Sequence, residues 1–418
     1  MNQAFYSGIS GLKNYSTGID VLSDNLANAQ TTGFRAYEAE YASLFEETLA
    51  STSASLSDSI GAGVTVQATG MDTSQGTIIA TDRSLDVALS GDGWFGIAAG
   101  EEGKPVYTRD GAFGVDANAN LVTADGFYVL GSMANNIDEN NVLTQQLETT
   151  QLGAVGTQGK LTLPPTLTFP TKPSTKVDFI GNLGLDPEPV SMGSAVIDAQ
   201  SNRNNLELVF TKDENQVPPG VQYNVVAQVT SADGSVVYDT QEGRVTFDEQ
   251  GALINSTLST IDNNGTPLNI NLGESFNGII AVNSAVTSSS AADGTMGGDL
   301  VEYNVDGDGD IIASFSNGEQ SSIGKLAVYH FQNDQGLSRI NGSRFEQSPN
   351  SGDALFYKDA NGNNVVGTQI SNFNLESSNV DMTVGLTELI ILQRSYDANS
   401  KSVTTADEMI QKALDMDA

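Results

Sequence analysis

The sequence predicts a mainly β protein with α-helical termini, in which two β-rich domains, the middle one inserted into the inner one, adjoin a layer of N- and C-terminal helices. Three observations lead to this fold class. Apolar residues recur every seven positions at both ends of the chain. The interior consists of short β-type segments separated by Gly, Asp and Asn turns. A length of 418 residues also exceeds one ordinary core, because domains usually hold roughly 100 to 200 residues.

The N-terminal segment has a heptad-like apolar stripe, which predicts an amphipathic helix. The stripe consists of Phe5, Leu12, Ile19 and Leu26 at seven-residue spacing, with Tyr15 and Leu22 at the intermediate steps. Gly8, Gly11 and Gly18 lie inside the same segment, and each costs about 1 kcal/mol of helix propensity relative to Ala. We therefore expect this helix to be marginal alone and to order only when packed.

The C-terminal segment predicts a second amphipathic helix that runs nearly to the last residue. Ser378 and Asp381 have the spacing of a capping box ahead of it. Its seven-residue series is Met382, Leu389, Tyr396, Val403 and Ile410, flanked by Leu386 and Leu414. We expect a companion row of Gln393, Ser400 and Asp407. Such a partly polar seam suits adjustable packing better than a permanent dry core.

The segments between the two helices have β character. Six of the 11 prolines lie between Pro164 and Pro189 and indicate a domain boundary in that region. The stretch "ASTSASLSDSIGAGVTV" predicts a flexible or extended connector. We expect six segments: an N-terminal helix at 1–34, an extended connector at 35–70, the first part of an inner β domain at 71–149, an inserted outer β domain at 150–290, the second part of the inner domain at 291–370, and a C-terminal helix at 371–418.

Composition excludes several classes of function. The formal net charge of -34 opposes binding to a phosphate backbone, so nucleic acid is not an expected partner. The absence of cysteine excludes disulfides, thiolate nucleophiles and Cys-based metal sites. We expect no membrane insertion, because no run of about 18 apolar residues occurs. The N-terminus also lacks the pattern of a secretory signal, so any export would use a route that removes no signal peptide.

Two polar motifs suggest chemistry that their surroundings do not support. His330, the only histidine, lies in an alternating strand pattern, and no nucleophile elbow accompanies it as a Ser-His-Asp triad would require. "DGDGD" at 306–310 resembles the start of a calcium loop, but Ile311 and Asn317 stand where that loop needs Gly and a bidentate Glu. We expect a structural histidine and a polar β-turn.

Other catalytic possibilities are equally weak. With 52 acidic residues, carboxylate pairs of the glycosidase type are unavoidable by chance. Trp94 is better explained as a core or inter-domain residue than as a sugar platform, because it stands beside Phe95 in a Gly-bounded strand. A Gly-rich phosphate loop with an adjacent Lys is missing from the sequence. We expect no enzymatic activity, no catalytic or metal site and no cofactor.

The terminal helices are the strongest candidates for function. Burial of some six apolar side chains on each would contribute on the order of 10 kcal/mol as an upper estimate. That energy is available either from pairing within one molecule or from pairing between many molecules. Amphipathic ends joined to a β body by polar connectors favour the second alternative, in which the helices are assembly elements.

Both ends also resemble one known family. "GISGLKNYSTGIDVLSDNLANAQTTGFRA" resembles the N-terminal signature of bacterial flagellar rod and hook proteins, and "LESSNVDMTVGLTELIILQRSYDANSKSVTTADEMIQKAL" resembles their C-terminal signature. "QGTIIATDRSLDVALSGDGWF" and "YTRDGAF" are similar to motifs of their inner domain. The length and the inserted middle region are similar to those of hook members, as are "PSTKVDFIGNLGLD" and "SNGEQSSIGKLAVYHFQNDQGL".

The resemblance implies a helical tube of many copies that acts as a universal joint and an export channel. It implies export through the flagellar type III apparatus, assembly under a hook cap, rod and hook-filament junction proteins at the two ends, and an extracellular location in the flagellum. The segment "NLANAQTTGF" at 25–34 would then be the turn by which the inner helix leaves the channel wall and enters the connector.

Three groups of residues carry the implied roles. Subunit assembly would involve Leu12, Ile19, Leu22, Asn25, Leu26, Asn28, Leu386, Leu389, Gln393, Tyr396, Val403 and Ile410. The turn and connector motif comprises Thr32, Gly33, Phe34, Leu375, Glu376, Ser378, Asn379, Val380 and Asp381. The inner-domain motif comprises Asp86, Gly93, Trp94, Phe95, Tyr107, Arg109, Gly111 and Phe113.

Two alternatives stay open on the sequence alone. One is a distal-rod or second hook-like protein of the same family. The other, from a different class, is a secreted β-rich glycan-binding protein or glycosidase, which would bind sugar near Trp94 and tolerate deletion of its termini.

Overall fold

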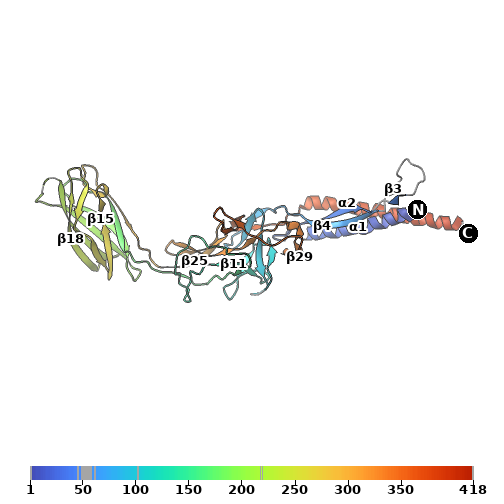
Figure 1. Ribbon diagram of the computed structural model, residues 1–418, viewed down its shortest axis with the longest axis horizontal. Coiled ribbons are helices and arrows are strands. Elements are labelled where there is room, and N and C mark those ends of the chain that lie inside the picture. Colours follow the sequence, from blue (N-terminus) through green and yellow to red (C-terminus); the bar gives the residue numbers. More distant parts are fainter. Residues whose placement is uncertain are drawn as a thin grey trace.

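The protein is an elongated molecule with three parts in a row (Figure 1). The computed structural model describes residues 2–44, 47–48, 59–60, 63–100, 103–216, 218 and 220–416. A helical layer, built on α1 (Asn2–Ala27) and α2 (Met382–Met416), occupies one end. The inner β domain follows, and the inserted β domain lies at the far end. Both termini lie at the helical end, so the chain runs out to the inserted domain and returns (Figure 1).

The two helices of the helical layer pack antiparallel within one chain. Gly8 faces Val403 near one end of the pair, and Gly385 faces Leu26 near the other. A Cβ added at Gly8 would come within 2.7 Å of the Val403 Cγ2 atom. The glycines that weaken α1 as an isolated helix thus allow α2 to approach closely. The expected α1 therefore has a partner in its own chain.

A long β-hairpin covers a further face of α1. Strands β1 (Tyr37–Ser43) and β4 (Val64–Met71) pair antiparallel from Tyr37↔Met71 to Ser43↔Val64. Asn14 of α1 binds the edge of β4, because its Nδ2 donates to the Val64 carbonyl at 2.6 Å and its Oδ1 accepts from the Val66 amide at 2.7 Å. Residues expected as an extended connector, 35–70, thus include a hairpin bound to the helix.

Part of that connector lies outside the residues that the structure describes. The flexible stretch expected from "ASTSASLSDSIGAGVTV" spans 50–66, of which 50–58 and 61–62 are not described. Of the described part, β2 (Glu47–Thr48) pairs antiparallel with β3 (Ser59–Ile60).

The inner β domain is built from segments on both sides of the inserted domain. Its main sheet has 13 strands, with the path β13-β25-β26-β27-β11-β7-β8-β30-β29 and four strands off that path. Three two-stranded sheets, β6 with β33, β5 with β34 and β31 with β32, complete it. The 3-10 helix η1 (Asp334–Gly336) lies in this domain. The strands are β5 (Ile78–Ala80), β6 (Val87–Ser90), β7 (Trp94–Ala98), β8 (Val106–Thr108), β9 (Phe113–Val115), β10 (Leu121–Thr123), β11 (Tyr128–Met133), β12 (Gly159–Lys160), β13 (Thr168–Phe169), β25 (Gly298–Val305), β26 (Asp310–Phe315), β27 (Gln320–Leu326), β28 (Val328–Tyr329), β29 (Ser338–Asn341), β30 (Arg344–Glu346), β31 (Tyr357–Lys358), β32 (Asn364–Val365), β33 (Gln369–Asn372) and β34 (Asn374–Glu376).

The inserted β domain is a sandwich with its own core. Alternate residues of β16, such as Leu206, Leu208 and Phe210, are buried and face residues of the second sheet such as Phe179 and Ile270. One sheet has the order β15-β16-β17-β18-β19 and the other β20-β21-β14-β23-β22, with β24 on β14. The strands are β14 (Lys176–Asn182), β15 (Val190–Ile197), β16 (Arg203–Lys212), β17 (Val221–Ser231), β18 (Val237–Phe247), β19 (Leu253–Ser256), β20 (Thr260–Asn263), β21 (Thr266–Asn271), β22 (Gly273–Glu274), β23 (Asn277–Ile280) and β24 (Thr287–Ala292).

The two β domains are joined by two chain segments that lie side by side. Lys172 and Thr295 exchange both backbone hydrogen bonds, at 2.9 and 2.8 Å. The first domain boundary lies later than the expected residue 150, because Leu152, Leu161 and Phe169 are buried in the core of the inner domain. The segment 371–418 also differs from the expectation, since β33 and β34 precede the helix.

The capping box expected at the start of α2 is not formed. Asp381, rather than Ser378, occupies the capping position, and its Oδ1 accepts from the amides of Thr383 at 2.7 Å and Val384 at 3.1 Å. The Ser378 hydroxyl instead accepts from the Val380 amide at 3.3 Å. Neither helix in the described part of the chain is long and apolar enough to cross a membrane.

Candidate functional site

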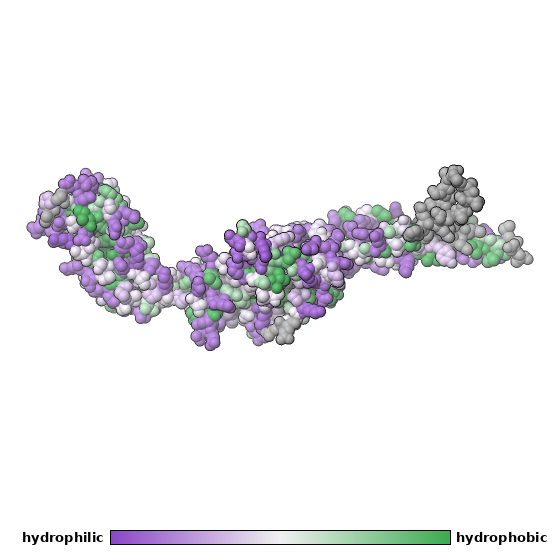
Figure 2. All heavy atoms as spheres, in the orientation of Figure 1, coloured by the Kyte–Doolittle hydropathy of each residue, from purple (hydrophilic) through white to green (hydrophobic). Residues whose placement is uncertain are grey.

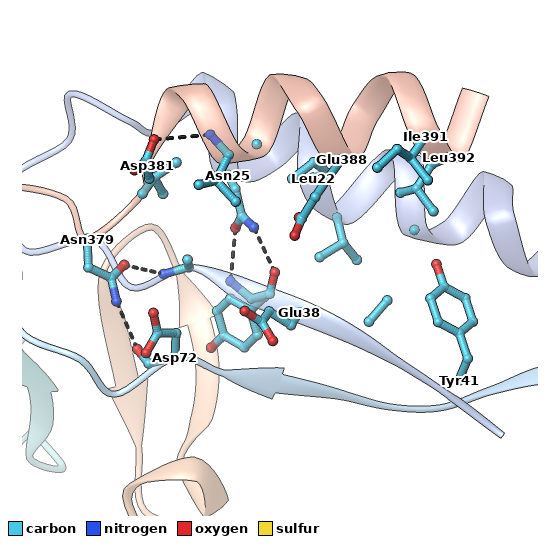
Figure 3. A pocket seen from close by; sticks show the side chains of 18 residues that line it. Leu22, Asn25, Glu38, Tyr41, Asp72, Asn379, Asp381, Glu388, Ile391 and Leu392 are labelled. Atoms are coloured by element: carbon cyan, nitrogen blue, oxygen red, sulfur yellow. Dashed lines mark hydrogen bonds between the residues drawn. The ribbon is translucent and has the colours of Figure 1, made fainter. Parts of the chain in front are cut away.

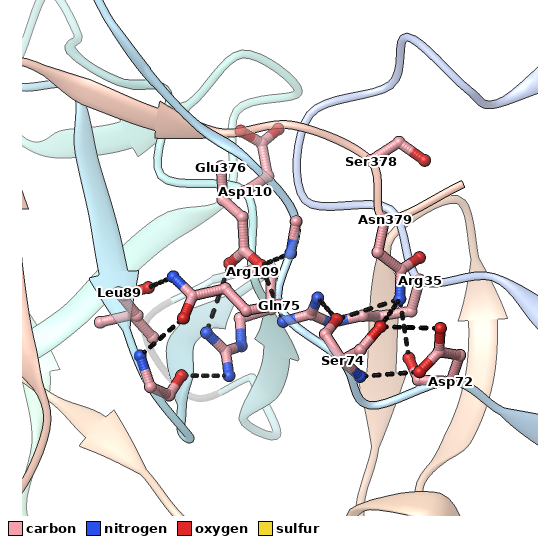
Figure 4. Close-up of polar contacts among 12 residues, drawn as sticks. Arg35, Asp72, Ser74, Gln75, Leu89, Arg109, Asp110, Glu376, Ser378 and Asn379 are labelled. Carbon is pink, nitrogen blue, oxygen red and sulfur yellow. Dashed lines mark hydrogen bonds and ion pairs between the residues drawn. The ribbon is translucent and has the colours of Figure 1, made fainter. Parts of the chain in front are cut away.

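A buried ion cluster joins the helical layer to the inner β domain (Figure 4). The Glu376 carboxylate at the end of β34 lies 2.9 Å from Arg35 Nη2 and 3.3 Å from Arg109 Nη1. All three side chains are at most 3% exposed. Glu376 Oε1 also accepts the amide of Gly76 at 2.9 Å. One carboxylate thus connects three segments far apart in the sequence, and we call these residues the junction cluster.

Arg109 is a deeply buried cation of the junction cluster. Burial lowers its pKa to about 10, although Glu376 acts in the opposite direction, so it remains charged at neutral pH. Its Nη2 donates to the Gly91 carbonyl at 2.7 Å, and its guanidinium lies 5.5 Å from the centroid of the Trp94 ring. Loss of one member of such a cluster leaves an uncompensated buried charge, which is strongly destabilising.

Asn379 forms a second connection beside the junction cluster (Figure 4). Its Oδ1 accepts from the Ala36 amide at 2.7 Å, and its Nδ2 donates to the carbonyls of Asp72 at 3.1 Å and Ser74 at 3.0 Å. Its own amide donates to the Phe34 carbonyl at 3.3 Å. One amide side chain therefore supplies hydrogen-bond partners to backbone groups of two segments that lie outside helices and strands.

The turn after α1 fits tightly against the inner domain. Gly33 has φ +67°, and a Cβ there would lie 2.5 Å from the Asp110 amide nitrogen. Its amide donates to the Glu376 carbonyl at 2.8 Å. Phe34 is 1% exposed, and the Arg339 guanidinium lies 5.1 Å from its ring centroid. Glycine is required here both by the backbone conformation and by the close approach.

Asn25 fixes the direction of the chain beyond the turn. Its Nδ2 donates to the Tyr37 carbonyl at 2.7 Å, and its Oδ1 accepts from the Tyr37 amide at 2.9 Å (Figure 3). The side chain thereby forms with the backbone of Tyr37, the first residue of β1, the two hydrogen bonds that a neighbouring strand would form. Asn28, in contrast, only caps locally, donating to the Asp24 carbonyl at 2.9 Å.

An open groove of about 390 Å³ lies between α1, α2 and the hairpin (Figure 3). Its floor and walls include Leu22, Tyr41 and Ile391, and four acidic residues line it. Burial raises the pKa of the Tyr41 hydroxyl, which stays protonated. We call this feature the acidic groove; its carboxyl residues are Glu38, Asp72, Asp381 and Glu388.

The helical layer exposes many apolar side chains. Apolar patches also follow the helices at that end of the molecule in Figure 2. Most of those on α2 lie on either side of the row that packs against α1, and Tyr396 lies in that row. Those at least 39% exposed are Tyr6, Ile9, Met382, Val384, Leu386, Ile390, Ile391, Tyr396, Met409 and Leu414. Exposed apolar side chains in this number are typical of an interaction site.

The predicted assembly residues divide between the inside and the outside of the helical layer. Leu22 and Asn25 are buried. Leu386 and Tyr396 are 49% and 39% exposed, and Gln393 is exposed. The half-buried residues are Leu12, Ile19, Leu26, Asn28, Leu389, Val403 and Ile410.

The companion row expected on α2 is wrong at two of its three positions. Gln393 and Asp407 are exposed, whereas Ser400 is half-buried. The residues that alternate with Leu389, Tyr396, Val403 and Ile410 on the packed face are Gly385, Leu392, Asn399 and Ala406. Gly385 and Asn399 gave no apolar signal in this row, although their small size or short polar side chain is what the close contact with α1 requires.

The remaining turn and inner-domain residues have structural positions. Thr32 is half-buried in the turn, as are Leu375 and Val380 in the return segment. Trp94 packs on Phe345 at 4.8 Å between ring centroids, and Phe95 on Phe113 at 5.2 Å.

The other members of that motif lie at close backbone contacts or in the core. Asp86 is 2% exposed, with Oδ1 3.4 Å from Arg83 Nη1. Gly93 has φ +127°, and a Cβ at Gly111 would overlap the Val87 carbonyl. Tyr107 is 3% exposed, and burial raises its pKa to about 12.

The polar motifs with alternative chemistry have structural partners. His330 is 2% exposed, with Nε2 2.7 Å from the Val366 carbonyl and its ring 4.1 Å from that of Tyr357. Burial lowers its pKa. Asp306 accepts the amides of Asp308 at 3.0 Å and Asp310 at 2.8 Å, forming the turn between β25 and β26.

Neither a metal cluster nor a sugar platform is evident in the described ranges. No group of three or more His, Asp or Glu side chains that could hold a metal ion occurs among those residues. Trp94 is 2% exposed, and its Nε1 donates to Asp334 at 3.2 Å. A buried indole offers no face for sugar stacking.

Sequence reasoning missed Arg35, Asp72 and Ser74 of the junction. Arg35 directly follows the Gly33-Phe34 turn, and a cation beside a turn in so acidic a chain is a weak signal. Its partner Glu376 could not be found from spacing, because the two residues lie 341 positions apart in the sequence.

Comparisons with known proteins agree with this geometry. The family described as "Flagella basal body rod protein" matches residues 5–35. "Flagellar hook protein FlgE/F/G D1 domain" matches 88–168, and "Flagellar basal body rod FlgEFG protein C-terminal" matches 372–416. The three matches cover α1 with its turn, the first part of the inner domain, and β34 with α2.

Relatives of known name align over nearly the whole chain. The flagellar hook proteins FlgE of Salmonella typhimurium and Escherichia coli are each 28% identical over 99% of this chain and 100% of their own length. That of Borreliella burgdorferi is 27% identical over 99% of both chains. The crystal structure of the Helicobacter pylori flagellar hook protein FlgE2 is similar in fold, with a TM-score of 0.55 and 16% identity over 72% of this chain and 100% of the other.

Proposed function

Because the chain belongs to the family of bacterial flagellar hook and rod proteins, we propose that it is the structural subunit of a flagellar hook whose copies form a bendable helical tube. In this proposal the tube transmits the rotation of the motor to the filament as a universal joint and encloses an export channel. The observation that carries the proposal is the helical layer, which combines a paired core with exposed apolar faces.

The exposed faces of α2 supply the driving force for assembly. Leu386 and Ile390 are 49% and 51% exposed on one flank of the packed row, and Val384 and Ile391 are 52% and 56% exposed on the other. Full burial of an aliphatic side chain contributes about 1.5 to 3 kcal/mol. Covering the exposed halves of these and the similar residues would thus yield on the order of 10 kcal/mol per copy as an upper estimate.

The arrangement of stiff and soft connections suits a tube that bends while it rotates. Each row of subunits must shorten and lengthen once per turn, so outer parts must shift while the inner layer holds together. The junction cluster fixes the helical layer to the inner domain through buried charges. The two β domains have separate cores and meet through the paired segments at Lys172 and Thr295. We assign the compliance of the tube to that second connection.

The same proposal includes the partners and the place of action. The chain would pass through the flagellar type III export apparatus and join the tube under a hook cap, with rod proteins at one end and hook-filament junction proteins at the other. The assembled tube would lie outside the cell as part of the flagellum. These partners follow from the family and not from a particular surface of this chain.

Electron microscopy of polymerised protein tests the proposal. We expect curved tubes from the full chain, and soluble monomers from the variant Leu386→Asp/Ile390→Asp, because both side chains are exposed in the single molecule and their replacement leaves its core intact. The variant Leu386→Met/Ile390→Leu is the matched control and should form tubes. Tubes of normal yield from the double Asp variant would contradict the proposal, and straight tubes from the full chain would indicate a rod-type member of the family.

A further inference from the structure

The helical layer carries a basic ridge as well as the acidic groove. The ridge consists of Arg394, Lys401 and Lys412, which are all exposed on α2. Their spacings of seven and eleven residues keep them on one face of a helix. That face points away from the packed row, since Arg394 lies nine residues, or two and a half turns, from Gly385.

We propose that the basic ridge of one copy docks in the acidic groove of a second copy. This inference rests on the proposed function, since it names the contact by which the helical layers of neighbouring subunits recognise each other. The occupant is thus a second copy of this chain.

The acidic groove contains negative charge that its own molecule leaves uncompensated. Asp381 caps α2 and Asp72 accepts from Ser74, so both carboxylates have local uses. Glu38 and Glu388 are exposed, and no residue in the described part of the chain forms an ion pair with either. Covering this groove with anything other than a cation would bury carboxylates without a partner, which is costly.

The basic ridge has the complementary character. In the described ranges, Arg394, Lys401 and Lys412 have no ion-pair partner either. The whole sequence has only 18 basic residues against 52 acidic ones, so three aligned cations are an unusual local feature. The exposed acidic residues Asp397 and Glu408 lie three or four positions from these cations on the same helix. Met409, 51% exposed, flanks the ridge and matches the apolar walls of the groove.

The geometry favours a contact between copies. Arg394 and Lys401 on the ridge are seven residues apart, so they span about 10 Å along α2. The ridge and the groove lie on different faces of one rigid helix, so a copy cannot dock on itself. A contact between two different surfaces is heterologous, and when it does not close into a ring it produces an open helical array.

Charge reversal on both sides provides the first test. We expect the ridge variant Arg394→Glu/Lys401→Glu and the groove variant Glu38→Lys/Glu388→Lys each to raise the critical concentration for tube formation on the order of tenfold to a hundredfold, since facing like charges repel strongly. The quadruple variant that combines them should return most of the way to the wild-type value. Lys358→Glu, an exposed reversal on β31, is the control and should change little.

The outcomes separate this inference from the proposed function. Normal assembly of either double variant, or a quadruple variant no better than the doubles, would overturn the docking inference while the tubes of the wild type upheld the proposed function. Absence of wild-type tubes would defeat both. Circular dichroism of each monomer checks that the exposed substitutions leave the fold unchanged.

Cross-linking gives a second measurement that does not depend on polymer yield. The chain has no cysteine, so disulfides arise only from those introduced. Glu388→Cys combined with Lys401→Cys places the two thiols 13 residues, or about 20 Å, apart on one helix, too far for a disulfide within a copy. We expect oxidised tubes to give covalent ladders with this pair or with Glu388→Cys/Arg394→Cys, and at most dimers with each single variant. No ladder from either pair would contradict the docking inference.

Discussion

Replacement of Glu376 by Gln removes one charge from the junction cluster and keeps the shape of the side chain. In the native protein the carboxylate lies 2.9 Å from Arg35 and 3.3 Å from Arg109, and all three groups are almost fully buried. Breaking a buried ion pair costs about 3 to 5 kcal/mol because the remaining charge is left unpaired. At about 1.4 kcal/mol per factor of ten, opening of the junction should become on the order of a hundredfold to a thousandfold more frequent.

Amide hydrogen exchange measures this opening directly. The Gly33 amide donates to the Glu376 backbone carbonyl, and the Ala36 amide donates to Asn379, so both report on the junction without bonding to the altered carboxylate. Amides of the inserted domain, such as Val225, belong to a separate core and should keep their exchange rates. Glu346→Gln, at an exposed residue of β30, is the matched control. Unchanged exchange at Gly33 and Ala36 in Glu376→Gln would refute the role assigned to the buried charges.

Three further changes test other parts of the structure. Gly33→Ala should destabilise the chain by more than Gly126→Ala. Both positions have a positive φ, which costs an alanine about 1 to 2 kcal/mol, but only at Gly33 would the new Cβ clash with backbone atoms. Equal urea midpoints for the two variants would contradict this. Asp381→Ala should cost about 1 kcal/mol at the start of α2 and speed exchange at the Thr383 amide, where Asp381→Asn should not. His330→Asn should weaken the fall in stability as the pH drops below about 6.5. Burial lowers the pKa of His330, so on acidification the unfolded chain binds a proton at this residue before the folded chain does. The stability that this histidine contributes above its unfolded pKa is therefore lost as the pH falls toward its folded pKa. Parallel curves of urea midpoint against pH for the two proteins would exclude that contribution.

The terminal helices were predictable because their signal is local and periodic. The apolar series of seven located both helices, which the structure places at Asn2–Ala27 and Met382–Met416. The packed row of α2 was only half predictable. Leu389 and Val403 are apolar and belong to it, but Gly385 and Asn399 belong to it through small size or a short polar side chain, which a hydrophobic pattern does not register.

The junction cluster was out of reach of sequence patterns for a different reason. The family resemblance singled out Arg109 and Glu376 as motif residues, but the pairing of Glu376 with both Arg35 and Arg109 depends on how three distant segments meet. The predicted boundary of the inner domain was wrong for a similar reason. Leu161 and Phe169 lie in a proline-rich segment with few strand signals, yet both are buried in the core of the inner domain. Long-range packing decides such cases, and it leaves little trace in local composition.

The acidic residues and the basic residues of this chain carry different amounts of information. Many aspartates serve one repeated local purpose, in which Oδ1 accepts the amides two and four residues ahead and closes a hairpin turn. This geometry occurs at Asp116, Asp138, Asp198, Asp248, Asp306 and Asp359. Much of the negative charge therefore follows from a β-rich fold with many short turns, and it says little about partners.

Basic residues are scarce in this chain, so the position of each one in the fold is informative. Arg35 and Arg109 are buried at the junction, and Lys325 is buried in the inner domain, 2.8 Å from Asp310. These three stabilise the inside of a single copy. Exposed cations aligned on α2 have no such internal use among the described residues. In a chain whose surface is otherwise repulsive toward its own copies, attraction between copies must come from apolar area and from these few positive charges. The basic ridge is for this reason the first place at which to look for the contact that sets how neighbouring subunits align.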